Sequence, residues 1–181
     1  MLPALNQIAS QQAQPTQRVL TKVQRLLDHA NTYSQAYVRF YASDMQLMID
    51  SDAAYLVFPK ARSRITGYFR LANKPSSKYK YKDNGAILIE CHTLHHVVSS
   101  AAEAETKGVF QNAKLSLPIH HILIAMGHPQ DPTPIATDNT TTTAFAHKNM
   151  VMKKSKSWDM NLHWLRDKEI QKYFKIFWEK G

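Results

Sequence analysis

The chain has 181 residues, which suits one domain of ordinary size plus an extension, and its 44% apolar content is enough for a hydrophobic core. Its formal net charge of +9 favours a polyanionic partner, either nucleic acid or an anionic membrane surface. The single cysteine excludes an internal disulfide, no apolar run is long enough to span a bilayer, and the N-terminus lacks the pattern of a signal peptide. We therefore expect an intracellular, cytoplasmic protein.

The first forty residues are expected to form a helical extension. Residues 3–13 have a short amphipathic pattern that ends before Pro15. Residues 16–33 place apolar side chains at helical spacing, with Arg18, Lys22 and Arg25 on the opposite face. We predict this extension over residues 1–40 and a separate domain over residues 44–181.

Three strands are predicted next, over residues 45–58, 63–72 and 86–94, with a turn near Pro59–Ala61. Strands joined by such short connections form an antiparallel meander. The third strand is the most uniformly apolar of the three. We therefore expect it to be the most buried.

A basic segment without acids spans the second strand and the connection that follows it. Residues 60–82 contain eight Lys or Arg and no Asp or Glu, interleaved with tyrosines and a phenylalanine. This combination is typical of contacts with a phosphate backbone. The predicted nucleic-acid-binding side chains in this segment are Arg62, Arg64, Lys78, Lys80 and Lys82.

The second half of the chain alternates helices with strands. A helix is predicted from about Ser99 to Leu115, where Pro118 should interrupt it before a second segment that Gly127 ends. A strand over residues 132–139, helices over residues 140–150 and 155–171, and a final strand follow. Strands separated by helices return parallel to a strand already in place. The expected fold is therefore α/β, with a five-stranded mixed sheet flanked by helices.

Three acidic residues occupy positions that such a fold brings together. Asp52 lies in the first strand, Glu105 in the first long helix, and Asp138 at the end of the fourth strand. Helical spacing puts Glu105 at the edge of the apolar face and Glu103 toward water. A carboxylate cluster persists when cations neutralise it, and all-oxygen ligands suit Mg²⁺ or Mn²⁺. Together with the basic surface, these acids favour metal-dependent hydrolysis of a nucleic-acid backbone.

A zinc site and a cysteine nucleophile are the weaker interpretations. Cys91, His92, His95 and His96 have the side chains that zinc prefers, but Cys91 and His92 are neighbours in a predicted strand and should face opposite sides of the sheet. A thiol inside a buried strand is usually inert.

Five segments of the sequence, in this order, resemble the ribonuclease H domain of copia-type LTR retrotransposons. They are SDAAYLV (51–57), ARSRITGYF (61–69), VVSSAAEAE (97–105), TDNTTTT (137–143) and KSKSWDMNLHWLRDKE (154–169). Residues 1–40 are similar to the helices that join the reverse transcriptase of the same polyprotein to this domain. The resemblance implies a ribonuclease H-like fold.

The resemblance also implies an activity and a set of ligands. Such a domain cleaves the RNA strand of an RNA/DNA hybrid during retrotransposon reverse transcription, leaves 5′-phosphate and 3′-hydroxyl ends, and uses two Mg²⁺ or Mn²⁺ ions. By motif, Asp52, Glu105 and Asp138 are the catalytic metal ligands, with Asp52 bridging both ions, and Asn139 joins the nucleic-acid-binding residues. The implied partners are the hybrid and the reverse transcriptase portion of the polyprotein, with no membrane, and the implied setting is a virus-like particle.

The sequence departs from the family pattern in two places. Ser157 stands where histidine is common, and the chain ends at Gly181, before the segment in which a fourth acid is expected. Asp159 is a candidate for that ligand. The alternative is thus a catalytically impaired remnant that only binds nucleic acid, and an integrase or other nuclease with a related fold is a third hypothesis.

Overall fold

The computed structural model describes residues 1–74, 84–146 and 156–180. Its contacts divide the chain into two compact units, Met1–Arg39 and Phe40–Gly181. The first unit contains α1 (Leu2–Ala9) and α2 (Gln17–Thr32). The Thr16 side chain accepts a hydrogen bond from the backbone N–H of Val19 and so caps α2. None of the described helices is both long and apolar enough to cross a bilayer.

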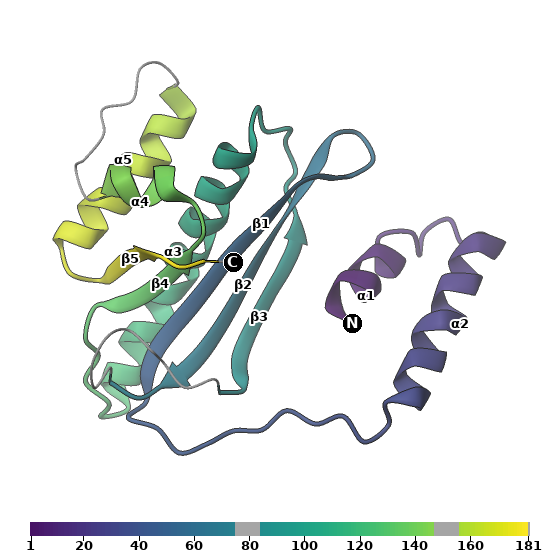
Figure 1. The fold of residues 1–181 in the computed structure, drawn as a ribbon, viewed down its shortest axis with the longest axis horizontal. Helices are drawn as coiled ribbons and strands as arrows, with labels where there is room; N and C mark the ends of the chain where they lie inside the picture. Colours follow the sequence, from purple (N-terminus) through teal and green to yellow (C-terminus); the bar gives the residue numbers. More distant parts are fainter. Residues whose placement is uncertain (75–83, 147–155, 181) are drawn as a thin grey trace. The chain divides into compact units, whose positions relative to one another are not determined.

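The second unit is a five-stranded mixed sheet with helices packed against it (Figure 1). The strands, in the spatial order β3-β2-β1-β4-β5, are β3 (Ala86–Thr93), β2 (Arg62–Ala72), β1 (Gln46–Phe58), β4 (Thr133–Thr137) and β5 (Phe174–Trp178). β1, β2 and β3 pair antiparallel, whereas β4 pairs parallel with both β1 and β5. The helices are α3 (Ala101–Ala125), α4 (Thr140–Ala146) and α5 (Lys156–Ile170). The predicted fold and element order are confirmed.

The hydrophobic core lies between the sheet and α3, which packs across β1, β2 and β4. Its fully buried side chains are Leu47, Ile49, Phe69, Val109, Ala113, Leu123, Ile135, Leu165, Phe174 and Ile176. The alternation of β1 and β2 puts one side of each strand into this core, because successive side chains of a strand point to opposite faces. The position of α3 relative to β1 is therefore set by close packing.

Two expectations about individual elements were wrong. β3 is not the most buried strand, since Ile87 and Ile89 are 44% and 46% exposed. It is an edge strand, and these side chains lie on the face opposite α3.

Pro118 does not interrupt α3, which continues to Ala125. Pro118 is on the exposed side, where the carbonyl left without its N–H partner can bind water. Gly127 follows the helix with φ of 90°, as predicted.

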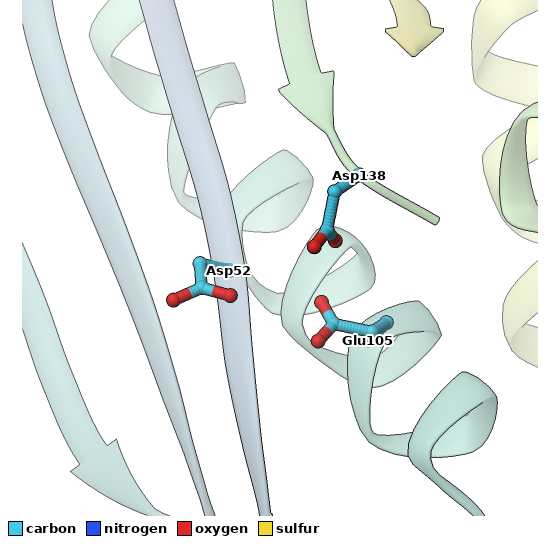
Figure 2. Close-up of side chains that lie close together, drawn as sticks. All are labelled: Asp52, Glu105 and Asp138. Carbon is cyan, nitrogen blue, oxygen red and sulfur yellow. The ribbon is translucent and has the colours of Figure 1, made fainter. Parts of the chain in front are cut away.

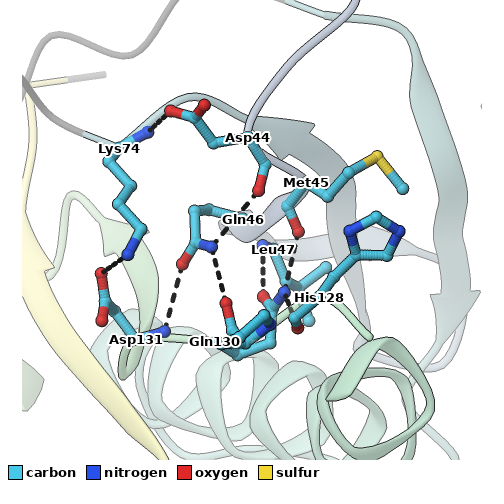
Figure 3. Close-up of polar contacts among 9 residues, drawn as sticks. Asp44, Met45, Gln46, Leu47, Lys74, His128, Gln130 and Asp131 are labelled. Carbon is cyan, nitrogen blue, oxygen red and sulfur yellow. Dashed lines mark hydrogen bonds and ion pairs between the residues drawn. The ribbon is translucent and has the colours of Figure 1, made fainter. Parts of the chain in front are cut away.

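Two glutamine side chains join the beginning of β1 to the loop that leads into β4 (Figure 3). Gln130 accepts a hydrogen bond from the N–H of Leu47 and donates to the carbonyl of Met45, at 2.9 and 2.8 Å. Gln46 donates to the carbonyl of Pro129 and accepts from the N–H of Asp131, at 2.9 and 3.1 Å. These bonds fix the two segments side by side before β1 and β4 begin to pair.

Candidate metal centre

The three predicted acids come together where β1 and β4 end their pairing. Asp50 is registered with Ala136 in the parallel ladder, so two more residues along each strand bring Asp52 beside Asp138. Glu105 approaches from α3 (Figure 2). One carboxylate oxygen from each acid lies within 4.8 Å of the other two. Of the described residues, only these form such a group of potential metal ligands.

The first turn of α3 decides which of its two glutamates faces this cluster. Ser100 caps the helix by accepting a hydrogen bond from the N–H of Glu103. The Glu103 carboxylate accepts two bonds from Ser99, at 2.8 and 2.7 Å, and pairs with Lys107 at 3.1 Å. Glu103 was expected to face water, but its side chain is only 12% exposed because it is used in this cap. Glu105 is left to face the sheet.

Glu105 is the most strongly perturbed carboxylic acid of the cluster. Burial, followed by the nearby charges of Asp138 and Asp52, raises its pKa to about 8, and a hydrogen bond from the N–H of Ala53 opposes this rise. The Oε2 atom of Glu105 is buried without a hydrogen-bond partner. An unpartnered buried carboxylate oxygen beside two other acids suits a cation, because burying a charge without compensation is costly.

Several solved structures share this architecture. LC11-RNase H1, isolated from compost, superimposes with a TM-score of 0.52 at 7% identity, over 75% of this chain and 84% of that chain. The fold is therefore ribonuclease H-like. The N-terminal RNase H domain of Rv2228c from Mycobacterium tuberculosis (TM-score 0.49, 9% identity, 75% and 82% covered) and the PFV RNase H domain (0.42, 17%, 75% and 78%) are also similar. No protein-family model and no curated protein sequence matches the chain.

The donor atoms at this end of the ribonuclease H-like sheet suit a hard divalent cation. Asp52 and Asp138 are exposed and Glu105 is half-buried, so the cluster is open to solvent on one side and closed by α3 on the other. All three ligands are carboxylate oxygens, which Mg²⁺ and Mn²⁺ bind in preference to zinc. The residues present therefore fit the predicted Mg²⁺ or Mn²⁺.

The raised pKa of Glu105 predicts how stability depends on pH when no metal is bound. Between about pH 4.5 and 8 the folded chain keeps a proton on Glu105 that the unfolded chain has lost, so this residue makes folding less favourable as pH rises. We expect Glu105→Gln to raise the melting temperature in EDTA, and by more at pH 8 than at pH 5.5. Thermal unfolding of both proteins at the two pH values measures this difference. An equal effect at both pH values would contradict the raised pKa.

The predicted nucleic-acid-binding residues have different surroundings. Arg64 is registered with Ala54, two residues from Asp52 and on the same face, and its guanidinium lies 4.4 Å from the centre of the Phe58 ring. Arg62 Nη1 and Arg64 Nε are buried and have no hydrogen-bond partner. Each guanidinium therefore has one buried N–H group without a partner in the described part of the chain.

Of the other predicted site residues, one bonds within the fold and the rest lie outside the described residues. Asn139 is 7% exposed, accepts a bond from the N–H of Thr142 at the start of α4, and donates to the carbonyl of Ala102. Its side chain joins α4 to α3, and its contact with a nucleic acid stays a prediction. Lys78, Lys80 and Lys82, and the side chain of Asp159, lie outside the described residues.

Two of the histidines near Cys91 contact charged side chains. Cys91 is half-buried, and His92 lies 3.3 Å from the carboxylate of Glu90. His96 contacts Lys107, and burial followed by the charge of Lys107 lowers its pKa, with Arg62 contributing in the same direction and Glu103 opposing. No metal-ligand group that includes these side chains is found in the described part of the chain.

Two supports of the site were not predicted from the sequence. The indole N–H of Trp178 donates to the carbonyl of Asp138 at 3.0 Å, and the N–H of Glu179 donates to the carbonyl of Thr137. The end of β5 therefore holds the backbone that carries Asp138. The apolar pattern of residues 172–180 indicated a strand, but nothing in that pattern indicates a bond between residues forty positions apart.

Proposed function

We propose that this chain is a metal-dependent endoribonuclease of the ribonuclease H type, which cleaves the RNA strand of RNA/DNA hybrids. The observation that carries the proposal is the cluster of Asp52, Glu105 and Asp138, whose ligand oxygens lie within 4.8 Å of one another. Its place just beyond the end of the parallel pairing between β1 and β4 agrees with where α/β folds carry their sites. The ribonuclease H-like fold, shared with LC11-RNase H1, supports the same reaction class.

In this proposal Asp52, Glu105 and Asp138 would hold two Mg²⁺ or Mn²⁺ ions. Two such ions, when bound, supply an activated water and stabilise the leaving oxygen of the phosphodiester. Burial beside the other two acids raises the pKa of Glu105, so the side chain holds a proton when no cation is bound. Its carboxylate becomes available when a cation replaces that proton. Arg62 and Arg64, on the strand that pairs with β1 beside Asp52, are the proposed contacts for phosphate oxygens of the substrate.

Cleavage of a labelled RNA/DNA hybrid tests the proposal. The full chain should cut the RNA strand in Mg²⁺ or Mn²⁺, leave the DNA strand and single-stranded RNA intact, and stop in EDTA. The new RNA ends should carry a 5′-phosphate and a 3′-hydroxyl. Cutting that continues in EDTA, or cutting of both strands, would contradict the assignment to this class.

The basic surface predicts a salt-dependent affinity for the hybrid. Because each phosphate contact releases counterions, replacing Arg62 and Arg64 together by Gln should weaken binding and reduce the slope of log affinity against log salt by about 2. Binding is measured in EDTA by fluorescence anisotropy between 50 and 300 mM salt. An unchanged slope would exclude both arginines from the interface.

The cleavage assay, combined with this binding measurement, separates the second candidate function. A remnant that only binds nucleic acid would keep this salt-dependent affinity and give no cleavage in either metal. The net charge of +9 supports binding in both cases, so only the cleavage assay distinguishes an enzyme from a binding protein.

We further propose that the chain derives from a copia-type retrotransposon and that residues 1–40 are the end of its reverse transcriptase. The ordered motifs at residues 51–57, 61–69, 97–105, 137–143 and 154–169 support this origin. The cytoplasmic or particle-associated setting follows from the same origin. The reading frame that flanks the coding sequence tests it, since a reverse transcriptase should lie directly upstream.

A further inference from the structure

We propose that Asn112 is a positioning residue for the metal centre, because its buried amide fixes the helix that carries Glu105 against the strand that carries Asp52. The proposal rests on the proposed metal centre, and it assigns to Asn112 no contact with metal or substrate. Asn112 is 1% exposed in the middle of α3, among side chains that are otherwise small or apolar.

The hydrogen bonds of Asn112 leave its own helix and reach two strands. Its Nδ2 atom donates to Ser51 Oγ at 2.9 Å and to the carbonyl of Thr66 at 2.8 Å. Ser51 directly precedes Asp52 in β1, and Thr66 is the residue of β2 that pairs with Asp52. Thr66 in turn donates from its hydroxyl to the carbonyl of Asp52 at 3.2 Å. The Asn112 amide therefore bonds both to the residue before Asp52 in β1 and to the residue of β2 that pairs with Asp52.

Asn112 and Glu105 also share a helix face. They are seven residues apart, close to two full turns, so a shift or rotation of α3 that moves Asn112 moves Glu105 with it. Gly108 lies between them and is packed closely on β1, since an added Cβ would lie 3.5 Å from the carbonyl oxygen of Asp52. The distance between the Asp52 and Glu105 carboxylates is set by this contact and by the bonds of Asn112.

The choice of asparagine is not explained by packing alone. The Oδ1 atom of Asn112 is buried without a hydrogen-bond partner, which is unfavourable for stability. A leucine, whose side chain branches at the same atom, would avoid that loss but could not bond to Ser51 and Thr66. The bonds instead give α3 one register on the sheet, which a cluster of three repelling acids needs in order to bind a cation.

Titration of the full chain with Mn²⁺ alone, followed by calorimetry, tests this role. Asn112→Leu should weaken Mn²⁺ binding about tenfold, in the range seen when groups that orient metal ligands are removed. The matched control is Ser116→Ala, which also removes a buried polar group from α3. Among the described residues Ser116 bonds only within its helix, to the carbonyl of Ala113, so the Mn²⁺ affinity of Ser116→Ala should stay within about twofold of the unchanged protein. Ser51→Ala, which removes one of the two acceptors, should give an intermediate loss and serves if Asn112→Leu does not fold.

Thermal unfolding of each variant in EDTA separates positioning from general stability. The proposal expects Asn112→Leu to lose affinity out of proportion to its change in melting temperature. The proposal is overturned if Asn112→Leu and Ser51→Ala bind Mn²⁺ like the unchanged protein, or if the unchanged protein does not bind Mn²⁺. It is also overturned if Ser116→Ala loses as much Mn²⁺ affinity per degree of melting temperature as Asn112→Leu does. Binding of Mn²⁺ without cleavage of hybrid would count against the proposed function alone.

Discussion

Replacing Asp52 by Asn is expected to reduce hybrid cleavage by at least about 10³-fold, with little effect on folding. The substitution keeps the shape of the side chain and removes one of the negative charges of the cluster, so the cation that stabilises the transition state is held less well. A loss of roughly 4 kcal/mol of transition-state stabilisation corresponds to this factor. Asp52 is exposed, which keeps the structural cost of the change small. Initial rates on a labelled hybrid at saturating Mg²⁺ measure the effect.

Glu105→Gln and Asp138→Asn should give losses of the same order, because the three oxygens act as one ligand set. The matched control is Asp167→Asn, which makes the same change at an exposed acid of α5 that, among the described residues, bonds only to Gln171. Its rate should be unchanged. Activity that persists in all three cluster variants would show that the ligands lie elsewhere.

The order of the elements was predictable because it follows from chain connectivity. Short connections require the antiparallel meander β1-β2-β3, and the helices that separate β4 and β5 require parallel pairing. Burial within the sheet was not predictable from the same pattern. Ile87 and Ile89 are apolar and exposed because β3 is at the edge, and the position of a strand in the sheet is a property of the assembled fold.

The metal centre was predictable for a similar reason. Asp52 and Asp138 each lie two residues beyond the last registered pair of the parallel strands β1 and β4, and the capping sequence at Ser99–Glu103 decides that Glu105 faces them. The residues that hold these acids in place gave no such signal. In the sequence Asn112 is one of several polar residues of a predicted helix. Only the structure shows that its side chain bonds to β2 and to Ser51, which is 61 positions away in the sequence.

The contact between Asn112 and Gly67 leads to the second large effect, which is on stability. A Cβ atom at Gly67 would lie 2.3 Å from Asn112 Oδ1, 2.7 Å from its Cγ and 2.9 Å from its Nδ2. Because Asn112 is buried and bonded to two strands, its side chain cannot move aside without losing those bonds. Gly67→Ala should therefore lower the free energy of unfolding by about 2–3 kcal/mol, the cost of overpacking a well-packed core. Urea unfolding measures it.

Shortening the side chain of Asn112 should remove most of the stability loss caused by Gly67→Ala. In an Asn112→Ala background the space below Gly67 is free, so Gly67→Ala should be nearly neutral, and the two changes should couple by roughly 1–3 kcal/mol in a double-mutant cycle. Gly108→Ala is the matched control, because its Cβ would meet the nearest atoms at 3.5 Å, an ordinary contact, inside a helix that favours alanine. It should leave the protein as stable or more stable by up to about 1 kcal/mol. Additive effects of Gly67→Ala and Asn112→Ala would mean that the glycine is not there to admit the asparagine.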